Sequence, residues 1–306
     1  MSRVCRVCLA EVRGEADYHP HCLRSLFGIS KAPTLDIETG KLHLAALKMV
    51  GHTSLSGIQK KISVNLSADR ATLHVAVEGG RYILKPQTET YPHLPENEHT
   101  TTQLARLCGI EVAVGGLIAL KDRSLAYIVR RFDRLPDGRK VRQEDFCQLA
   151  EKSPREKYDG SAELCVRLLR KYASEPIVEI LKLYRLLLFA WWTGNGDMHL
   201  KNLSVLVDEA GLVRLTPAYD LVSTRLVIPD DQLALPIGGK RDRLARADWL
   251  KFGAYCGLPE KAVARTLNEL VKSSLKAKAL VGRSLLDDAQ KEELALLLSE
   301  RADLLT

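Results

Sequence analysis

Two hydrophobic patterns divide the chain near residue 140. Before that point, short runs of β-branched and aromatic residues alternate with Gly, Asp and Pro, which is typical of strands joined by turns. One helix is expected among these strands, over residues 96–109, because Leu104, Leu107 and Cys108 share a side and Gly109 follows as a stop. The expected strands lie within residues 60–66, 72–79, 80–86, 115–122 and 125–133.

After residue 140, apolar residues recur three and four positions apart, which predicts helices with a strand-like insert over residues 202–222. A β-rich front part and a helical back part predict an α+β, bilobal fold with a nucleotide between the lobes. The predicted divisions are an N-terminal segment 1–30, an N-lobe 31–145 and a helical C-lobe 146–306. The expected helices cover residues 161–173, 175–193, 249–257, 260–275 and 288–302.

The composition is that of a globular protein. Of the 306 residues, 46% are hydrophobic and 27% are charged, which excludes disorder, collagen and coiled coil as the main architecture. The longest apolar run, residues 186–192, is far shorter than the ~20 residues of a membrane helix. The N-terminus shows no apolar stretch typical of a secretory signal. We therefore expect a cytoplasmic protein without a membrane partner, whose seven cysteines are reduced thiols or metal ligands.

The charge balance permits an anionic partner without identifying one. The formal net charge is +7, from 45 basic and 38 acidic residues scattered along most of the chain. RNA, DNA, an acidic protein and ATP are all compatible with it. Residues 261–283 are the exception, because six basic residues stand there against Glu269 alone. A solvated helix face is the simplest interpretation of that stretch.

The segment from Gly194 to Asn202 carries the most informative polar residues. Small residues end an apolar helix there, Asp197 follows, and Asn202 comes five residues later. Asp220 follows another short apolar strand. Phosphoryl transfer needs one acid that orients the acceptor hydroxyl, and an amide and a second acid that hold Mg²⁺. These residues fit that pattern, and a capped helix end with a turn aspartate is the alternative.

The front half holds candidates for binding ATP. Lys85 ends an apolar strand, where a lysine can contact the α- and β-phosphates, and Glu98 in the next helix could hold it. Upstream lies a loop of small residues that includes Ser54, Ser56 and Gly57. Its backbone N–H groups and hydroxyls suit phosphate oxygens, although an ordinary turn has a similar composition.

A separate group of soft ligands lies near the N-terminus. Cys5 and Cys8 form a CxxC pair, which is followed by Cys22 and by His19 or His21. Three thiols and one imidazole suffice for a tetrahedral Zn²⁺. The chain has no second CxxC pair, and the segment around the histidines could instead be a plain turn. Zinc and a metal-free turn therefore both stay open, and the other four cysteines are expected in the core.

Several linked motifs in a fixed order resemble the HipA-like serine/threonine kinase toxin family of bacterial toxin–antitoxin systems. The resemblance is close over about residues 50–225 and looser in the helical tail. It implies a bilobal, kinase-like fold related to the lipid-kinase branch. The motifs are GHTSLSGIQKKISV, YILKPQ, PENEHTTTQLARLCGIEV, VRRFDR, RQEDFCQLAEKSPREKY, GNGDMHLKNLSVL and PAYDLVST.

The resemblance implies a role for each residue that matches these motifs. Asp197 would be the catalytic base, and His199 in the same loop would orient that loop. Asn202 and Asp220 would bind Mg²⁺, and Lys85 would contact the phosphates of ATP. The activity implied is transfer of the ATP γ-phosphate to a serine or threonine of another protein.

Two further segments are implied by the same resemblance. The VRRFDR strand would be the hinge whose backbone meets adenine, near Arg130 and Phe132. Many family members have Glu where this chain has Arg130, so only a backbone contact to adenine is implied. Ser54 and Ser56 are similar to the paired serines of the short HipT-type kinases, which implies autophosphorylation in this loop.

The front of the chain also resembles the short HipT-type kinases. Full-length HipA proteins carry a longer β-rich subdomain ahead of the serine loop, where this chain has about fifty residues. HipS, a separate small protein, supplies that subdomain to HipT and is encoded with a HipB-like DNA-binding protein. The resemblance therefore implies HipS-like and HipB-like partners, and a translation-related substrate such as an aminoacyl-tRNA synthetase.

Two other function classes stay open. A nucleic-acid-binding module would account for the net charge, the N-terminal cysteines and the basic stretch 261–283. A small-molecule kinase on the same scaffold is also compatible, because no motif describes the acceptor. The complete set of Lys85, Asp197, Asn202 and Asp220 favours a protein kinase.

Overall fold

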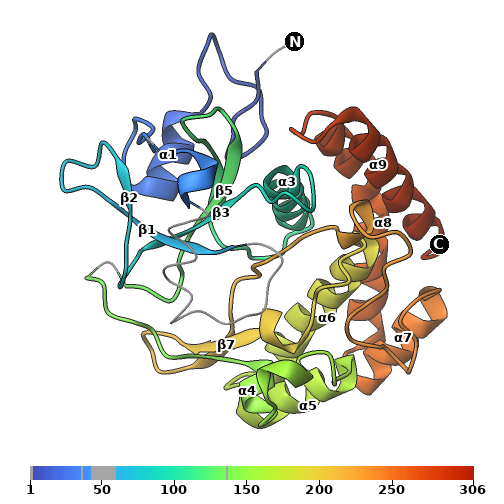
Figure 1. Cartoon of the computed structure of the whole chain (residues 1–306). Coiled ribbons are helices and arrows are strands. Elements are labelled where there is room, and N and C mark those ends of the chain that lie inside the picture. Colours follow the sequence, from blue (N-terminus) through green and yellow to red (C-terminus); the bar gives the residue numbers. More distant parts are fainter. Residues whose placement is uncertain (1–2, 36, 43–59, 136) are drawn as a thin grey trace. The chain divides into compact units, whose positions relative to one another are not determined.

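The computed structural model describes residues 3–35, 37–42, 60–135 and 137–306 (Figure 1). The chain divides into two compact units. The predicted loop residues Ser54, Ser56 and Gly57 lie outside the described residues. The divisions at residues 30 and 145 stay predictions. Unit 1 comprises residues 1–103, 113–139 and 283–287, and unit 2 comprises residues 104–112, 140–282 and 288–306.

Unit 1 is built on an antiparallel five-stranded sheet in the order β2-β1-β3-β5-β4. Lys85 pairs with Tyr127 between β3 and β5, and Leu84 pairs with Ile128. Because side chains alternate along a strand, these two pairs lie on opposite faces of the sheet. The strands are β1 Ile62–Leu66, β2 Leu73–Val75, β3 Tyr82–Pro86, β4 Gly115–Ala119 and β5 Leu125–Arg130.

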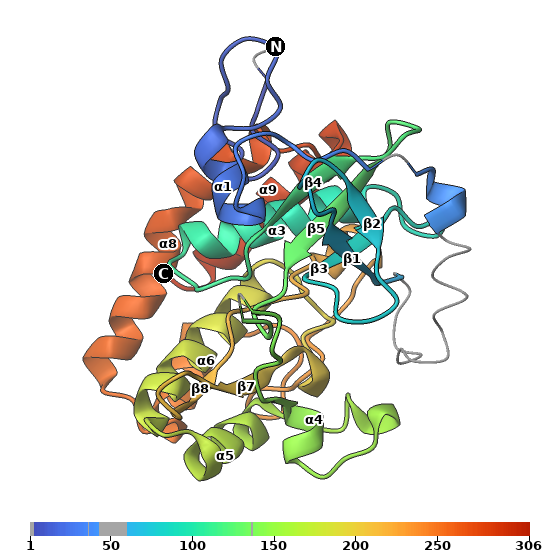
Figure 2. The ribbon, with the colours of Figure 1, turned by 90° about the vertical axis from the view of Figure 1, so that its left-hand side faces the viewer.

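A different helix packs on each face of this sheet (Figure 2). On the Leu84 face, Leu26 and Phe27 of α1 (Pro20–Phe27) join the strand residues in one buried core. On the Lys85 face lies α3 (Leu94–Leu107), where the Tyr127 hydroxyl donates to Thr102 Oγ1 at 3.4 Å. The sheet face that carries Lys85 is therefore also the face that meets α3.

Helix α1 was not predicted, because the sequence around the histidines was compatible with a plain turn. Pro20 occupies the first helical position, where its fixed φ suits a helix start. Gly28 ends the helix with a φ of 73°, in the left-handed region that glycine adopts easily. The eight residues between these signals bury one apolar side against the sheet, and that long-range contact stabilises the short helix.

Unit 2 is mostly helical and contains a small antiparallel sheet in the order β6-β7-β8. Its strands are β6 Gln143–Asp145, β7 Ser204–Val207 and β8 Val213–Leu215. Its helices are α4 Phe146–Leu149, α5 Ala162–Tyr172, α6 Pro176–Trp192, α7 Arg246–Tyr255, α8 Glu260–Gly282 and α9 Asp288–Asp303, with 3₁₀ turns η1 Pro154–Glu156, η2 Leu200–Asn202 and η3 Thr224–Leu226.

Most of the predicted elements are confirmed. Each of the five expected strands in the front half and each of the long expected helices is present, with ends shifted by a few residues. The insert 202–222 forms β7 and β8, whereas β6 and α4 are too short for a pattern to reveal. In the basic stretch, Lys261, Arg265, Lys272 and Lys276 are exposed on α8, as expected for a solvated helix face. None of the helices in the described part is both long and apolar enough to cross a membrane.

Helix α6 is the central element of unit 2. Its last residues, Trp191 and Trp192, are buried, and the Trp192 Nε1–H donates to the main-chain oxygen of Leu298 in α9 at 2.8 Å. The Tyr184 hydroxyl donates to the main-chain oxygen of Trp249 in α7 at 3.2 Å. These contacts fix the C-terminal end of α6, where the segment from Gly194 to Asn202 begins.

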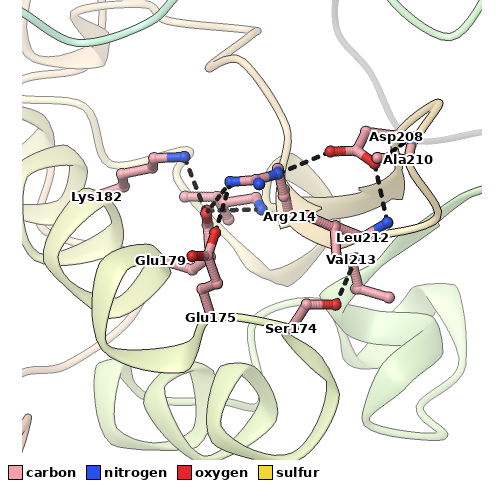
Figure 3. Close-up of polar contacts among 10 residues, drawn as sticks. Ser174, Glu175, Glu179, Lys182, Asp208, Ala210, Leu212, Val213 and Arg214 are labelled. Carbon is pink, nitrogen blue, oxygen red and sulfur yellow. Dashed lines mark hydrogen bonds and ion pairs between the residues drawn. The ribbon is translucent and has the colours of Figure 1, made fainter.

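Glu179 joins α6 to β8 through a buried carboxylate (Figure 3). Its side chain is fully buried, and Oε2 accepts from the main-chain N–H of Leu215 at 2.9 Å. Oε1 accepts from Lys182 Nζ at 2.9 Å. Arg214 pairs at the same place with the half-exposed Glu175 at 2.9 Å. Glu179 thus sets the position of the strand that leads to Asp220.

Glu179→Ala should destabilise the chain by about 1–3 kcal/mol, because it leaves the buried Leu215 N–H without its acceptor. Glu175→Ala, which also removes a partner of Arg214, should cost less than about 1 kcal/mol, because that carboxylate is half exposed. Urea unfolding of both variants measures the difference. Equal effects of the two substitutions would contradict the role assigned to Glu179.

Candidate active site

Lys85 and Glu98 form a buried ion pair in unit 1. Lys85 lies on β3, Glu98 lies in the second turn of α3, and Lys85 Nζ contacts Glu98 Oε1. The two side chains are only 3% and 2% exposed. Since either charge alone would lose its hydration, burial of both requires that they neutralise each other. The structure therefore brings together the strand lysine and the helix acid that the sequence singled out.

Neighbouring residues restrict the Lys85 ammonium group further. Its nitrogen lies 5.7 Å from the centroid of the Tyr127 ring, within the range of a cation–π contact. The next residue of α3, His99, is buried, and its Nε2 lies 3.0 Å from the main-chain oxygen of Val7. The contact between His99 and Val7 thus joins helix α3 to the N-terminal segment. Because Glu98 directly precedes His99 on this helix, the same contact restrains the position of Glu98.

Arg130 ends β5, and its side chain belongs to the opposite face of the sheet. Arg130 pairs with Tyr82, and each lies two residues from Ile128 or Leu84 along its strand, so both share the face that meets α1. The Arg130 side chain is exposed, and Phe132 two residues later is half-buried. The structure therefore does not place the Arg130 side chain on the face of Lys85.

Asp133 stabilises the segment that contains Arg130 and Phe132. Arg131 donates to both of its carboxylate oxygens, at 2.8 and 2.7 Å, and Arg134 donates at 2.5 Å. Burial raises the pKa of Asp133, but the hydrogen bonds and positive charges of Arg131 and Arg134 outweigh this effect. The pKa of Asp133 therefore lies below its ordinary value. The native state consequently binds fewer protons at this site than the unfolded state does.

Asp133→Asn should destabilise the chain by about 1–3 kcal/mol near pH 7, because the three hydrogen bonds from Arg131 and Arg134 lose their anionic acceptor. The ionised Asp133 carboxylate stabilises the folded state fully when the pH is above the unfolded-state pKa of about 3.9. This stabilisation is lost as the pH falls through the lower pKa of the folded state. The urea midpoints of variant and wild type should therefore converge as the pH falls below about 3.9. A constant difference over that range would show that ionisation of Asp133 does not contribute.

The loop of unit 2 that follows α6 depends on its two glycines. Gly194 has a φ of 69°, and a Cβ at this position would lie 2.7 Å from Arg225 Cβ. A Cβ on Gly196 would collide with the Asp231 carboxylate, and the Gly196 N–H donates to Thr224 Oγ1 at 2.7 Å. The small residues are therefore needed for close packing against η3, and this packing fixes the path of the loop.

Asp197 is the half-exposed acid of this loop, with 48% of its side chain accessible. Its N–H donates to Asn195 Oδ1 at 3.0 Å, and its Oδ1 accepts from the Tyr158 hydroxyl at 2.8 Å. His199 Nε2 lies 3.5 Å from the same oxygen. An accessible carboxylate with a restrained orientation can accept a hydrogen bond from an incoming hydroxyl group.

His199 lies behind Asp197 and is buried. Burial lowers the pKa of His199 below its ordinary value of 6.5, against the opposing influence of the Asp197 and Asp220 charges. The ring also forms a T-shaped contact with the Tyr158 ring, with 5.0 Å between the ring centroids. A neutral imidazole in this position can restrain the orientation of the Asp197 carboxylate.

Asn202 and Asp220 carry side-chain oxygens near Asp197 and His199, respectively. Asn202 Nδ2 donates to the main-chain oxygen of Asp197 at 2.8 Å, so the amide oxygen is the side-chain atom that could bind a cation. Asp220 has a φ of 54°, a conformation that is uncommon outside glycine and is concentrated at functional sites. Its charge influences the pKa of His199, so the two side chains are electrostatic neighbours.

Tyr158 is a functional candidate that the sequence reasoning missed. It lies 39 residues before Asp197 in the chain, just after η1, and donates its hydroxyl hydrogen bond to the Asp197 carboxylate. The motif RQEDFCQLAEKSPREKY ends at this tyrosine, so the motif contained the only available signal. Nothing in the spacing indicated which of its side chains would reach the loop.

The N-terminal ligands predicted from the sequence also come together. The ligand atoms of Cys5, Cys8, His19 and Cys22 all lie within 4.8 Å of one another. His21 is exposed and stacks on the His19 ring, with 5.1 Å between the ring centroids. The alternative left open between the two histidines is therefore decided in favour of His19.

Comparison with known proteins identifies the family. Residues 53–278 match the family model of the HipA-like C-terminal domain. The chain belongs to this HipA-like family. The family predicted from the motifs is thus confirmed, and the matched residues include the Lys85, Asp197, Asn202 and Asp220 positions.

HipA-like relatives of this chain carry the names of kinases. The putative kinases Y4mE and Y4dM of Sinorhizobium fredii are each 34% identical to it, over 74% and 72% of this chain and 56% and 57% of theirs. The serine/threonine-protein kinase toxin HipA of Shewanella oneidensis is 27% identical, over 72% of this chain and 55% of that protein. This chain therefore spans little more than half the length of these relatives.

Solved structures show the same fold. The HipA chain of the Shewanella oneidensis complex of HipA, HipB and operator DNA matches 90% of this chain with a TM-score of 0.70 at 21% identity, and 72% of that chain is covered. The Helicobacter pylori proinflammatory kinase CtkA matches 82% of this chain with a TM-score of 0.57 at 15% identity, and 91% of that chain is covered. The predicted α+β, kinase-like fold is confirmed.

Proposed function

We propose that this chain is an ATP-dependent protein serine/threonine kinase of a toxin–antitoxin system. The observation that carries the proposal is the buried Lys85–Glu98 pair. Protein kinases hold a strand lysine with a helix glutamate so that the ammonium group can contact the ATP phosphates. The names of the HipA-like relatives support the same activity.

Asp197 is the proposed catalytic base. It accepts a hydrogen bond from the serine or threonine hydroxyl of the substrate and takes up the proton as the oxygen bonds to the γ-phosphorus. The bond between that phosphorus and the β,γ-bridging oxygen breaks, and ADP leaves. Tyr158 and neutral His199 both approach Asp197 Oδ1, and in this way they position the carboxylate.

Asn202 and Asp220 are the proposed ligands of Mg²⁺. Both offer hard oxygen donors, and the Asn202 amide nitrogen is engaged by the Asp197 backbone, so the donor set fits a magnesium ion. When bound, Mg²⁺ neutralises negative charge on the phosphates. Within unit 1, the backbone near Arg130 and Phe132 is the proposed contact for adenine, and the loop with Ser54, Ser56 and Gly57 is the proposed cover of the phosphates.

The proposed partners follow from the relatives and from the resemblance to the HipT-type kinases. A HipB-like DNA-binding protein is supported by the Shewanella complex that contains HipA, HipB and operator DNA. A HipS-like protein is proposed as a second partner in the cytoplasm. The proposed substrate is a translation-related protein such as an aminoacyl-tRNA synthetase.

Incubation of the purified chain with radiolabelled ATP, Mg²⁺ and a cell lysate tests the proposal. We expect label on serine or threonine of a lysate protein, which mass spectrometry then identifies. Label confined to a small molecule would instead indicate a small-molecule kinase. Absence of any transfer, together with salt-dependent binding of DNA or RNA by the isolated chain, would replace the kinase with a nucleic-acid-binding module.

Autophosphorylation at Ser54 or Ser56 is part of the proposal. A phosphoserine adds a charge of about −1.5 to −2, which would repel ATP phosphates or capture a nearby cation. Intact-mass spectrometry after incubation with ATP should show added phosphate at one of these serines. Modification elsewhere, or none while substrate becomes labelled, would remove this step.

A further inference from the structure

We propose that Cys5, Cys8, His19 and Cys22 bind a structural Zn²⁺ ion that holds the N-terminal segment on unit 1. Four ligand atoms of the right kind converge there: three thiol sulfurs and one imidazole nitrogen, all within 4.8 Å of one another. Cys8 Sγ lies 3.4 Å from His19 Nδ1, and Cys22 Sγ lies 4.0 Å from it. Tetrahedral zinc with bonds of about 2.0–2.3 Å brings its ligand atoms to about this separation.

The turn that carries Cys5 and Cys8 is shaped by backbone hydrogen bonds. The Cys5 N–H donates to the Ala10 oxygen at 2.8 Å, and the Leu9 N–H donates to the Cys5 oxygen at 2.9 Å. Leu9 has a φ of 58°, a left-handed conformation that a leucine rarely adopts. A bridge between Val4 and Glu11 closes the turn. In this turn, which includes the unfavourable Leu9 conformation, the sulfurs of Cys5 and Cys8 lie on the same side, toward His19 and Cys22.

The orientation of His19 suits a metal ligand. Its Nε2 lies 2.9 Å from the main-chain oxygen of Glu11. A carbonyl oxygen only accepts hydrogen bonds, so Nε2 carries the proton and Nδ1 presents its lone pair to the sulfurs of Cys8 and Cys22. Metal-binding histidines are oriented in this way by a hydrogen bond from the other ring nitrogen. This contact is specific to His19, whereas the exposed ring of His21 lies outside the ligand group.

The sulfurs of Cys5 and Cys22 lie where negative charge is stabilised. Cys22 is in the first turn of the eight-residue helix α1, where the partial positive charge of the helix terminus favours a thiolate. The His19 main-chain N–H lies 3.4 Å from Cys5 Sγ and points at it. None of these three cysteines is joined in a disulfide, and deprotonated cysteine sulfurs are preferred soft ligands of zinc.

The metal would connect elements that are distant in the sequence. The residues between Cys5 and Cys8 contact the rest of unit 1: the Arg6 oxygen accepts from the Leu117 N–H of β4 at 2.7 Å, and the Val7 oxygen faces His99 Nε2 of α3 at 3.0 Å. His99 directly follows Glu98 on α3. A zinc ion that fixes this turn would therefore also restrain β4 and α3, the helix whose Glu98 pairs with Lys85.

Metal analysis of the full chain, purified without a metal-binding tag, tests the proposal directly. We expect one zinc per chain, release of zinc when a mercurial reagent titrates the thiols, and the absorption of tetrahedral thiolate coordination after exchange for Co²⁺. Cys8→Ser and His19→Ala should lower the zinc content to below about a tenth of the wild-type value. The matched controls Cys108→Ser and His21→Ala should keep one zinc per chain.

Removal of the metal from the wild-type chain keeps the test independent of any folding defect in the variants. A strong zinc chelator should lower the melting temperature, and added Zn²⁺ but not Mg²⁺ should restore it. Hydrogen exchange should rise in residues 3–28, β4 and α3 while α6 and α9 stay protected. The proposal is overturned by a wild-type chain that neither contains zinc nor gains stability from it, or by full zinc content in Cys8→Ser. None of these measurements depends on kinase activity.

Discussion

Asp197→Asn should lower phosphoryl transfer by about 10²–10⁴-fold while ATP binding and the melting temperature stay close to wild type. The amide keeps the size of the carboxylate but cannot take the proton from an acceptor hydroxyl. Because the Asp197 side chain is 48% exposed, the structural cost of the substitution is small. Initial rates with radiolabelled ATP, together with calorimetric titration of a non-hydrolysable analogue, measure the two effects separately.

Asp303→Asn is the matched control for this experiment. Asp303 is an exposed acid at the end of α9, so the same chemical change should leave transfer unaffected. Near-wild-type transfer by Asp197→Asn would refute its role as the base. Loss of analogue binding together with transfer would instead indicate that Asp197 contributes to binding the nucleotide or its metal ion.

Lys85→Met should abolish measurable ATP binding and should also destabilise the chain by about 3–5 kcal/mol. The stability loss is expected because Glu98, itself only 2% exposed, would keep a buried charge without its cation. The double variant Lys85→Met/Glu98→Gln removes that charge and should regain part of the stability. It should not regain ATP binding, since the ammonium group that contacts the phosphates is still absent.

Urea unfolding and analogue titration on the single and double variants separate these two roles of Lys85. Lys31→Met, which replaces an exposed lysine shortly after α1 in the same unit, should change neither quantity. Wild-type affinity of the double variant for ATP would show that Lys85 serves only the structure of unit 1. Equal stability of the single and double variants would show that the Glu98 carboxylate does not need the Lys85 ammonium group to remain buried.

The parts of this protein that the sequence determined are those that arise from local patterns. Alternation every second residue predicted the strands of unit 1, and recurrence every third and fourth residue predicted α5, α6, α8 and α9. The short spacing from Asp197 to Asn202 brings both residues into one loop whatever the surroundings, and the CxxC pair likewise places Cys5 and Cys8 in one turn. Such features depend on backbone geometry over a few residues, so they can be read without knowledge of the fold.

The tertiary structure alone decided the contacts between distant segments. Tyr158 reaches Asp197 across 39 residues, and the buried Glu179 carboxylate meets β8 across 36 residues. Strand pairing placed the Arg130 side chain on the face opposite Lys85, and the Glu11 carbonyl oriented His19 toward the cysteines. These outcomes depend on which buried surfaces pack together, and the free energy of that packing is a property of the whole chain that no local pattern records.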